Sequence, residues 1–141
     1  MDDPSYDDPD VLSDLEIVAR TVWGEARGEG VDGWVAVSWV IKNRAGHPGW
    51  WGRDLKSVCL KRAQFSSWNI DDRNRPKMLA LATNDPLLTR IRGTVAEVLA
   101  GTVPDPTGGA AYYHTKAVQP SWDAEMTKTA SIGAHDFFKD A

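Results

Sequence analysis

The sequence lacks what a disulfide scaffold, a membrane span or a secretion leader would need. Its 141 residues include a single cysteine, Cys59, so no disulfide can form within the chain. No run of residues approaches the roughly 20 apolar side chains of a transmembrane helix. The first ten residues contain five Asp and two Pro but no basic residue, which is the opposite of a signal peptide. We therefore expect a flexible acidic arm at 1–10 and one domain at 11–141, made in the cytoplasm and without stable membrane insertion.

Several signatures of catalysis and ligand binding are also missing. Neither a GxSxG nucleophile elbow nor a GxxxxGK phosphate loop occurs. The three histidines lack the close spacing of a zinc-binding helix and Cys59 has no CxxC partner, so we expect no metal and no cofactor. Residues 42–92 carry 4 acids and 11 bases, although the whole chain has a net charge of −4. A solvated surface explains this excess more simply than an anionic polymer does, and we expect no nucleic-acid partner.

Hydrophobic periodicity predicts a mainly helical domain. A capping box of Ser13 and Glu16 precedes apolar residues at the helical period, and Gly28 ends this first helix. Glu16 and Arg20 are expected to form an exposed pair on it. Residues 31–44 would be apolar around nearly the whole circumference of a helix, which predicts a central helix. Further helices are expected at 55–60 and 86–100.

Two segments near the end of the chain have a different character. Residues 104–114 and 129–138 each combine a glycine-containing turn with β-prone side chains. They predict a small antiparallel sheet beside the helices, so the expected fold class is α+β, mainly α. The polar stretch that begins at 64–68 holds too few apolar residues for regular structure.

Glu25 occupies a position where the pattern asks for an apolar side chain. It follows the apolar stripe of residues 15–22, in the last turn of the first predicted helix. Desolvation and the negative end of the helix dipole both favour a protonated carboxyl group there. Such a group is what a general acid needs to donate a proton to the leaving oxygen of a glycosidic bond. The residues alone leave open a Glu25 that reaches solvent or pairs with Arg27 or Arg44.

Five short motifs occur in an order that resembles the SleB/CwlJ-type cell-wall hydrolase family. They are GEARGE (24–29), VAVSWVIKNR (35–44), QFS (64–66), DPTGGAAYYH (105–114) and IGAHDFF (132–138). The resemblance implies a lysozyme-like or lytic-transglycosylase-like helical domain with a small antiparallel β element. It also implies peptidoglycan as partner, cleavage of its MurNAc–GlcNAc bond, and Glu25 as the catalytic acid. Phages carry relatives, so a phage endolysin or virion-associated lysin, with holin-dependent release, would fit the absence of a signal peptide.

The sequence leaves open whether one carboxylate is enough for the reaction. Ordinary glycosidases use two, and Glu29, Asp105 and Asp123 are candidates for the second. Glu29 can reach the glycan groove or fix the turn into the next helix, whereas Asp105 most simply caps the DPTGG turn. If the C6 hydroxyl of the sugar is the nucleophile, no second carboxylate is required. This lytic transglycosylase is our preferred hypothesis, with a muramidase that uses two carboxylates as the alternative.

Four residues are candidate substrate contacts. The Gln64 amide suits sugar hydroxyls and N-acetyl groups, or else ties down its own loop. Tyr113 is expected to face the groove and Tyr112 the core, because neighbours alternate across a strand. Trp122 offers a stacking face if it is not in the core, and Glu29 completes the set.

Other classes of function compete with this prediction. A non-catalytic glycan-binding or virion structural module would gain little from a costly buried acid such as Glu25. An amidase would require a zinc cluster or an activated cysteine, and neither is evident in the sequence.

Overall fold

The first two helices follow from capping and periodicity. The computed structural model describes residues 12–47, 52, 54–61, 65, 68, 72–116 and 125–140. Helix α1 spans Asp14–Ala26 and helix α2 spans Val31–Ala45, as predicted. The Ser13 hydroxyl accepts a hydrogen bond from the Glu16 amide at 3.2 Å, which caps α1.

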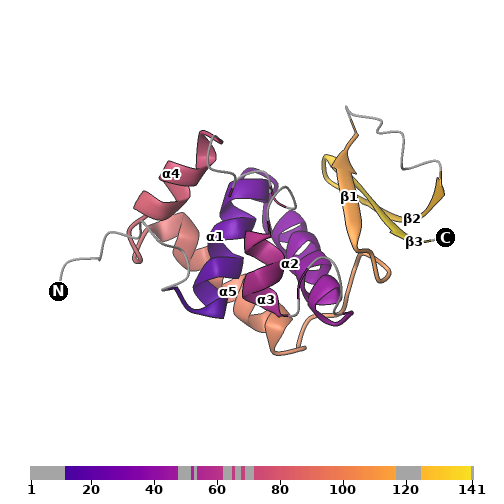
Figure 1. The fold of residues 1–141 in the computed structure, drawn as a ribbon, viewed down its shortest axis with the longest axis horizontal. Helices are drawn as coiled ribbons and strands as arrows, with labels where there is room; N and C mark the ends of the chain where they lie inside the picture. The colour runs from indigo at the N-terminus through magenta and orange to yellow at the C-terminus, as the bar shows by residue number, and fades with distance from the viewer. Residues whose placement is uncertain are drawn as a thin grey trace.

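Three further helices and three strands complete the described part of the fold. They are α3 (Leu55–Leu60), α4 (Asn74–Ala80), α5 (Pro86–Leu99), β1 (Tyr112–Thr115), β2 (Met126–Ile132) and β3 (His135–Asp140). The helices gather in one body, and the sheet lies at its side (Figure 1). The predicted α+β, mainly α fold class is confirmed, as are the helices expected at 55–60 and 86–100.

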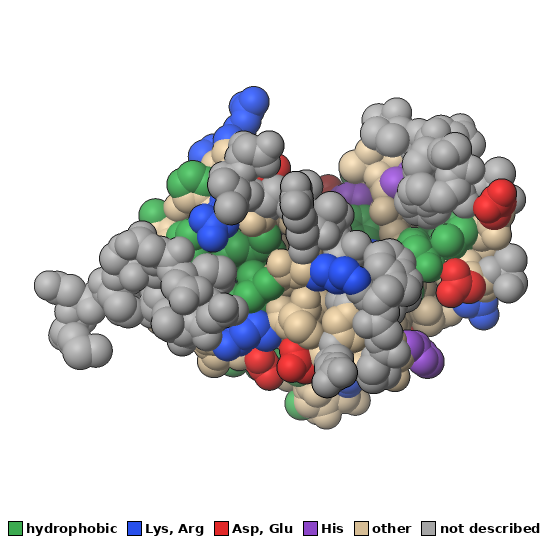
Figure 2. Space-filling view, viewed as in Figure 1, with side chains coloured by type: hydrophobic (Ala, Val, Ile, Leu, Met, Phe, Trp, Pro, Cys, Tyr) green, Lys and Arg blue, Asp and Glu red, His purple; other side chains and the backbone are tan. Residues whose placement is uncertain are grey.

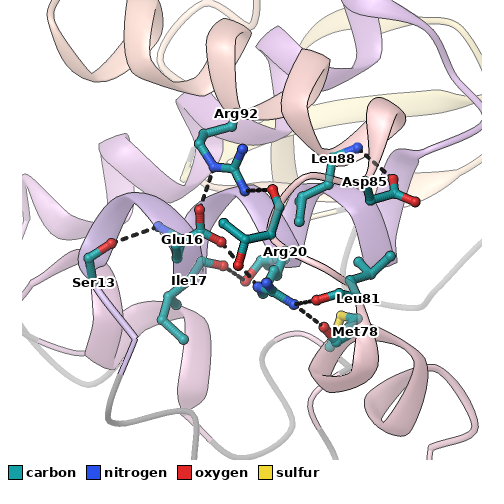
Figure 3. Close-up of polar contacts among 11 residues, drawn as sticks. Ser13, Glu16, Ile17, Arg20, Met78, Leu81, Asp85, Leu88 and Arg92 are labelled. Atoms are coloured by element: carbon teal, nitrogen blue, oxygen red, sulfur yellow. Dashed lines mark hydrogen bonds and ion pairs between the residues drawn. The ribbon is translucent and has the colours of Figure 1, made fainter. Parts of the chain in front are cut away.

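The predicted pair of Glu16 and Arg20 forms, but the prediction that it is exposed is wrong, because Arg20 does not lie on the surface. Its side chain is fully buried and donates to the backbone carbonyls of Met78 at 2.6 Å and Leu81 at 3.0 Å (Figure 3). The Glu16 carboxylate accepts from Arg20 and also from Arg92 of α5. One ion pair on α1 therefore connects three helices, which local spacing on a single helix does not reveal.

Helix α4 lies in the stretch for which the sequence predicted no regular structure. Met78 is its one buried residue, so it has no apolar stripe to reveal it. Tertiary contacts support it instead. Arg20 binds the carbonyl of Met78 in its last turn, and Arg27 donates to the Asn74 side chain at its start at 3.3 Å. The prediction failed because polar groups from α1, more than an apolar face, attach this helix.

The sheet is antiparallel with strand order β1-β3-β2. The segment 129–138, predicted as part of the sheet, forms a hairpin from parts of β2 and β3. Gly133 stands at its turn with φ +57°, a backbone conformation that favours glycine. Tyr113 of β1 lies opposite Phe137 of β3. The central strand β3 therefore connects the hairpin turn to the strand that carries Tyr113.

Two apolar clusters meet at α2. The larger one fills the helical body, and Trp34, Val37 and Ile41 belong to it. The smaller one joins α2 to the sheet and comprises Ala36, Val40, Ala110 and Phe137. Because α2 packs on both sides, its sequence is apolar nearly all round, as expected of a central helix.

Candidate active site

Glu25 lies in the last turn of α1, at the end of the helix that faces the sheet. Its side chain is half-buried, and its Oε1 accepts a hydrogen bond from the Tyr113 hydroxyl at 2.9 Å. Arg27 donates to the Trp23 carbonyl and to Asn74 rather than to Glu25. The pairing with Arg27 that the sequence left open is thus excluded, and the carboxylate is bonded across the gap between helix and sheet.

The molecular surface is hollowed between the helical body and the sheet. Figure 2 shows this hollow on the upper side of the view, with acidic and histidine side chains at its bottom. The C-terminal end of α1 lies at the same place in the ribbon (Figure 1).

Tyr113 is held on three sides. Its ring stacks on Phe137 at 5.7 Å between centroids and meets the His135 ring edge-on at 5.2 Å. Burial, followed by the charge and the hydrogen bond of Glu25, raises the pKa of Tyr113 well above its usual value of 10. The phenol therefore stays protonated at neutral pH, and its O–H group donates the hydrogen bond to Glu25.

The two neighbouring tyrosines are both half-buried. Tyr113, expected to face the groove, packs against both apolar clusters while its hydroxyl reaches Glu25. The core position was predicted for Tyr112, which is half-buried. Strand β1 is partly buried on both faces, so the alternation of its side chains does not give one exposed and one buried tyrosine.

Glu29 is bonded to the β2–β3 turn. Its Oε1 accepts from the backbone amide of Ala134 at 3.0 Å and lies 3.1 Å from Nδ1 of His135. The sequence offered the turn into α2 as its alternative partner, whereas the turn it holds is the hairpin 105 residues further along the chain. The Glu29 side chain keeps 21% of its surface exposed, so it is partly accessible to solvent.

Asp105 caps the DPTGG turn, as predicted. Its carboxylate accepts from the Thr107 amide at 2.8 Å, the Thr107 hydroxyl at 2.6 Å and the Gly109 amide at 3.0 Å. The Asn43 amide group adds a fourth bond at 3.0 Å. Partial burial raises its pKa, but these hydrogen bonds outweigh it and lower the pKa below the usual value. The remaining candidates, Gln64, Trp122 and Asp123, lie outside the described residues.

Polar residues at the end of α2 anchor the strand that carries Tyr113, and sequence reasoning missed this role. Asn43 donates to the Ala110 carbonyl at 3.0 Å, and Nε of Arg44 donates to the Ala111 carbonyl at 2.7 Å. Burial lowers the pKa of the Arg44 guanidinium, opposed by nearby Tyr113. The available signal was a run of three polar residues, Lys42, Asn43 and Arg44, near the end of a mostly apolar helix.

His114 and His135 lie on neighbouring strands of the sheet but do not contact the same partners. His114 lies opposite Asp136 and stacks on Phe138, whereas His135 lies opposite Thr115 and contacts Glu29. Neighbours in a strand point to opposite faces, so the two rings lie on different sides of the sheet. Within the described residues no group of three or more His, Cys, Asp or Glu side chains is arranged to hold a metal ion. In that same part of the chain, no helix is long and apolar enough to cross a bilayer.

A cavity of about 660 Å³ lies apart from Glu25 and Tyr113, neither of which lines it. Its wall includes Val31 and Val35 of α2, Glu97 of α5 and Gly133 of the hairpin turn. This cavity is therefore separate from the place where Glu25 and Tyr113 meet.

Comparison with known proteins places this geometry in a family. The model of a family described as Cell Wall Hydrolase matches residues 28–138, beginning three residues after Glu25. The spore cortex-lytic enzyme of Halalkalibacterium halodurans is 31% identical over 129 residues, covering 89% of this chain and 34% of the relative. The spore cortex-lytic enzyme of Oceanobacillus iheyensis is 31% identical over 139 residues, covering 96% and 46%. The chain thus spans between a third and a half of the length of these relatives.

A solved structure agrees with the fold. The catalytic domain of the germination-specific lytic transglycosylase SleB from Bacillus anthracis superposes with a TM-score of 0.71 and 27% identity. The match covers 94% of this chain and all of that one. The predicted resemblance and the predicted lysozyme-like fold are confirmed.

Proposed function

The chain belongs to the cell wall hydrolase family, and on this premise we propose that it is an enzyme that cleaves the glycan strands of peptidoglycan, with Glu25 as its general acid. The observation that carries the proposal is the bond between Glu25 and Tyr113 at the end of α1. It holds a half-buried carboxyl group in a fixed orientation between the end of α1 and strand β1. Fixed orientation and partial desolvation are what proton transfer to a bound substrate requires.

The reaction we propose is that of a lytic transglycosylase at the MurNAc–GlcNAc bond. Glu25 donates its proton to the glycosidic oxygen as the bond from C1 to that oxygen breaks. The C6 hydroxyl of the same MurNAc then attacks C1, and the Glu25 carboxylate takes the hydroxyl proton. The product is a 1,6-anhydro ring, Glu25 regains its proton, and no water is consumed.

Glu29 and Asp105 already accept hydrogen bonds from the protein, which supports a mechanism with one catalytic carboxyl group over a mechanism with two. Glu29 already accepts from the hairpin turn, and Asp105 accepts four hydrogen bonds within its own turn and from Asn43. Ordinary glycosidases need a second carboxylate free to activate water or attack the sugar. A muramidase would have to release one of these groups, or use Asp123.

The test compares the parent with Glu25→Gln on purified peptidoglycan. The amide keeps the shape of the side chain but cannot donate and recover a proton, so we expect activity to fall by about 10²–10⁴-fold. Glu97→Gln, an exposed change on α5, is the matched control and should leave activity unchanged. An active Glu25→Gln protein would show that Glu25 is not the general acid. Another residue would then be the catalyst, or the protein would be a glycan-binding module.

Mass spectrometry of the products decides between the two reaction classes. Anhydro products are lighter than hydrolysed muropeptides by one water, so their presence supports the lytic transglycosylase. Hydrolysed products together with an inactive Glu25→Gln protein would instead support the muramidase.

The biological setting remains a prediction. The setting we propose is that of a phage endolysin or virion-associated lysin, made in the cytoplasm and released to the wall through a holin lesion. Lysis of producing cells only after their membrane is permeabilised would support release of this kind. Lysis without permeabilisation would contradict it.

A further inference from the structure

The two glutamates of the GEARGE motif make different bonds. Glu25 is bonded to the phenol of Tyr113, whereas Glu29 is bonded to the backbone of Ala134 and the ring of His135. Both partners of Glu29 lie at the turn between β2 and β3. The motif therefore reaches the sheet at two points, one on β1 and one on the hairpin.

The contact at Glu29 depends on two glycines. A Cβ atom at Gly33 would lie 2.3 Å from Cβ of Glu29, and one at Gly133 would lie 2.9 Å from its Oε1. Real Cβ atoms do not approach other atoms so closely, so any side chain at either position would displace Glu29. The first turn of α2 and the hairpin turn are thus both shaped to admit this carboxylate.

The imidazole of His135 lies between Glu29 and Tyr113. A carboxylate oxygen accepts hydrogen bonds, so the bond between the two side chains requires a proton on Nδ1 of His135, facing Glu29. This bond sets the orientation of the ring, and the ring edge packs against Tyr113 at an angle of 79°. Tyr113 is in turn the residue that holds Glu25.

We propose that Glu29 is a positioning residue for the reaction, which acts through His135 and Tyr113 on the carboxyl group of Glu25. The inference rests on the proposed function of Glu25. Misplacing a catalytic group by about 1 Å costs up to about 10²-fold in rate, so the position of this side chain matters as much as its presence. Glu29 takes no proton from the substrate in this scheme and contributes an oxygen that accepts two hydrogen bonds.

The decisive comparison is Glu29→Gln against Glu29→Ala. The glutamine keeps an acceptor oxygen for Ala134 and His135, so we expect kcat within about threefold of the parent. The alanine removes the acceptor, and we expect kcat to fall by about 10- to 100-fold with KM nearly unchanged. A second catalytic carboxylate would behave differently, because glutamine would then be as inactive as alanine. That result would overturn the proposal.

A double-mutant cycle tests the route through Tyr113. If Glu29 acts through the phenol, Glu29→Ala should reduce kcat by less than about threefold in a protein that already carries Tyr113→Phe. Full multiplication of the two losses would show that Glu29 acts by another route and would overturn the proposal. Asp32→Ala, an exposed acid in the first turn of α2, is the matched control and should leave kcat unchanged.

Two further measurements separate positioning from unfolding and from a failure of the proposed function. His135→Phe keeps an aromatic edge against Tyr113 but has no Nδ1 donor, and we expect its kcat to fall while its melting temperature stays within a few degrees. The Nδ1–H signal of His135 in NMR should persist in Glu29→Gln and shift in Glu29→Ala, whether or not Glu25 is the catalyst. An active Glu25→Gln protein would refute the proposed function, whereas an inactive one beside a fully active Glu29→Ala would refute only the positioning role.

Discussion

Glu25 and Tyr113 meet at 2.9 Å, but the parts of the molecule that carry them are held in place by different forces. Helix α1 is fixed by fully buried apolar side chains, among them Ile17, Val18 and Val22. The sheet has a smaller apolar cluster with α2, and polar side chains of the helical body bind its strands and turns. These polar residues are Glu29, Asn43 and Arg44. Changes in the helical body should therefore alter mainly stability, and changes at the sheet should alter mainly the geometry of the site.

The largest expected effect tests the apolar side of this comparison. Ile17→Ala empties part of the cluster around α1, and we expect a loss of about 2–5 kcal/mol in the free energy of unfolding. Urea denaturation followed by circular dichroism measures it. A loss smaller than that of the polar Asn43→Ala variant described below would contradict the comparison.

Arg20→Met is expected to have the next largest effect, because it replaces a polar link inside the helical body. The variant keeps the volume of the side chain but removes the bonds to the carbonyls of Met78 and Leu81. Hydrogen bonds from a charged donor contribute about 1.5–3 kcal/mol, so we expect a loss of that size. Hydrogen exchange should quicken at α4 more than at α5. Lys77→Gln, an exposed change on α4, should show neither effect.

Asn43→Ala tests how the sheet is anchored. Its amide group bonds both Asp105 and the Ala110 carbonyl, and each bond contributes about 0.5–1.5 kcal/mol. We expect a loss of about 1–2 kcal/mol in stability together with a fall in kcat, because the segment leading to Tyr113 is loosened. A stability loss without any change in kcat would show that this anchor does not control the site.

The smallest expected effect is a dependence of stability on pH at Asp105. Its pKa is lower in the folded protein than in the unfolded chain, so its contribution is present above the unfolded pKa. That contribution is lost as the pH falls through the folded value. The difference in melting temperature between the parent and Asp105→Asn should therefore shrink as the pH is lowered from 7 to 3. A constant difference over this range would contradict the role of the ionised carboxylate in the turn.

The elements that were predicted correctly have their cause within a few residues. A side-chain cap at Ser13 starts α1, and a proline at position 86 starts α5. Helix α4 escaped prediction because Arg20 supports it from another helix. The hairpin within 129–138 was read as one segment because its β-prone residues run on both sides of Gly133. For α4 the missing information was a contact between distant residues.

The candidate site shows the same division. Glu25 could be singled out because an acid interrupted an apolar stripe, which is a local signal. Its partner is 88 residues away, and the partner of Glu29 is more than 100 residues away. No spacing along the chain indicates which of Tyr112 and Tyr113 would reach the acid, because this depends on how β1 packs against α1.

The sequence by itself determined the helices at 14–26, 31–45 and 86–99, the capped turn at Asp105 and the identity of Glu25 as an unusual acid. Only the tertiary structure decided that Tyr113 bonds Glu25, that Glu29 bonds the hairpin and that Arg20 is buried. Caps and hydrophobic periodicity depend on residues a few positions apart, so the sequence alone can reveal them. Hydrogen bonds between helix and sheet form only after packing has brought distant segments to within about 3 Å of one another.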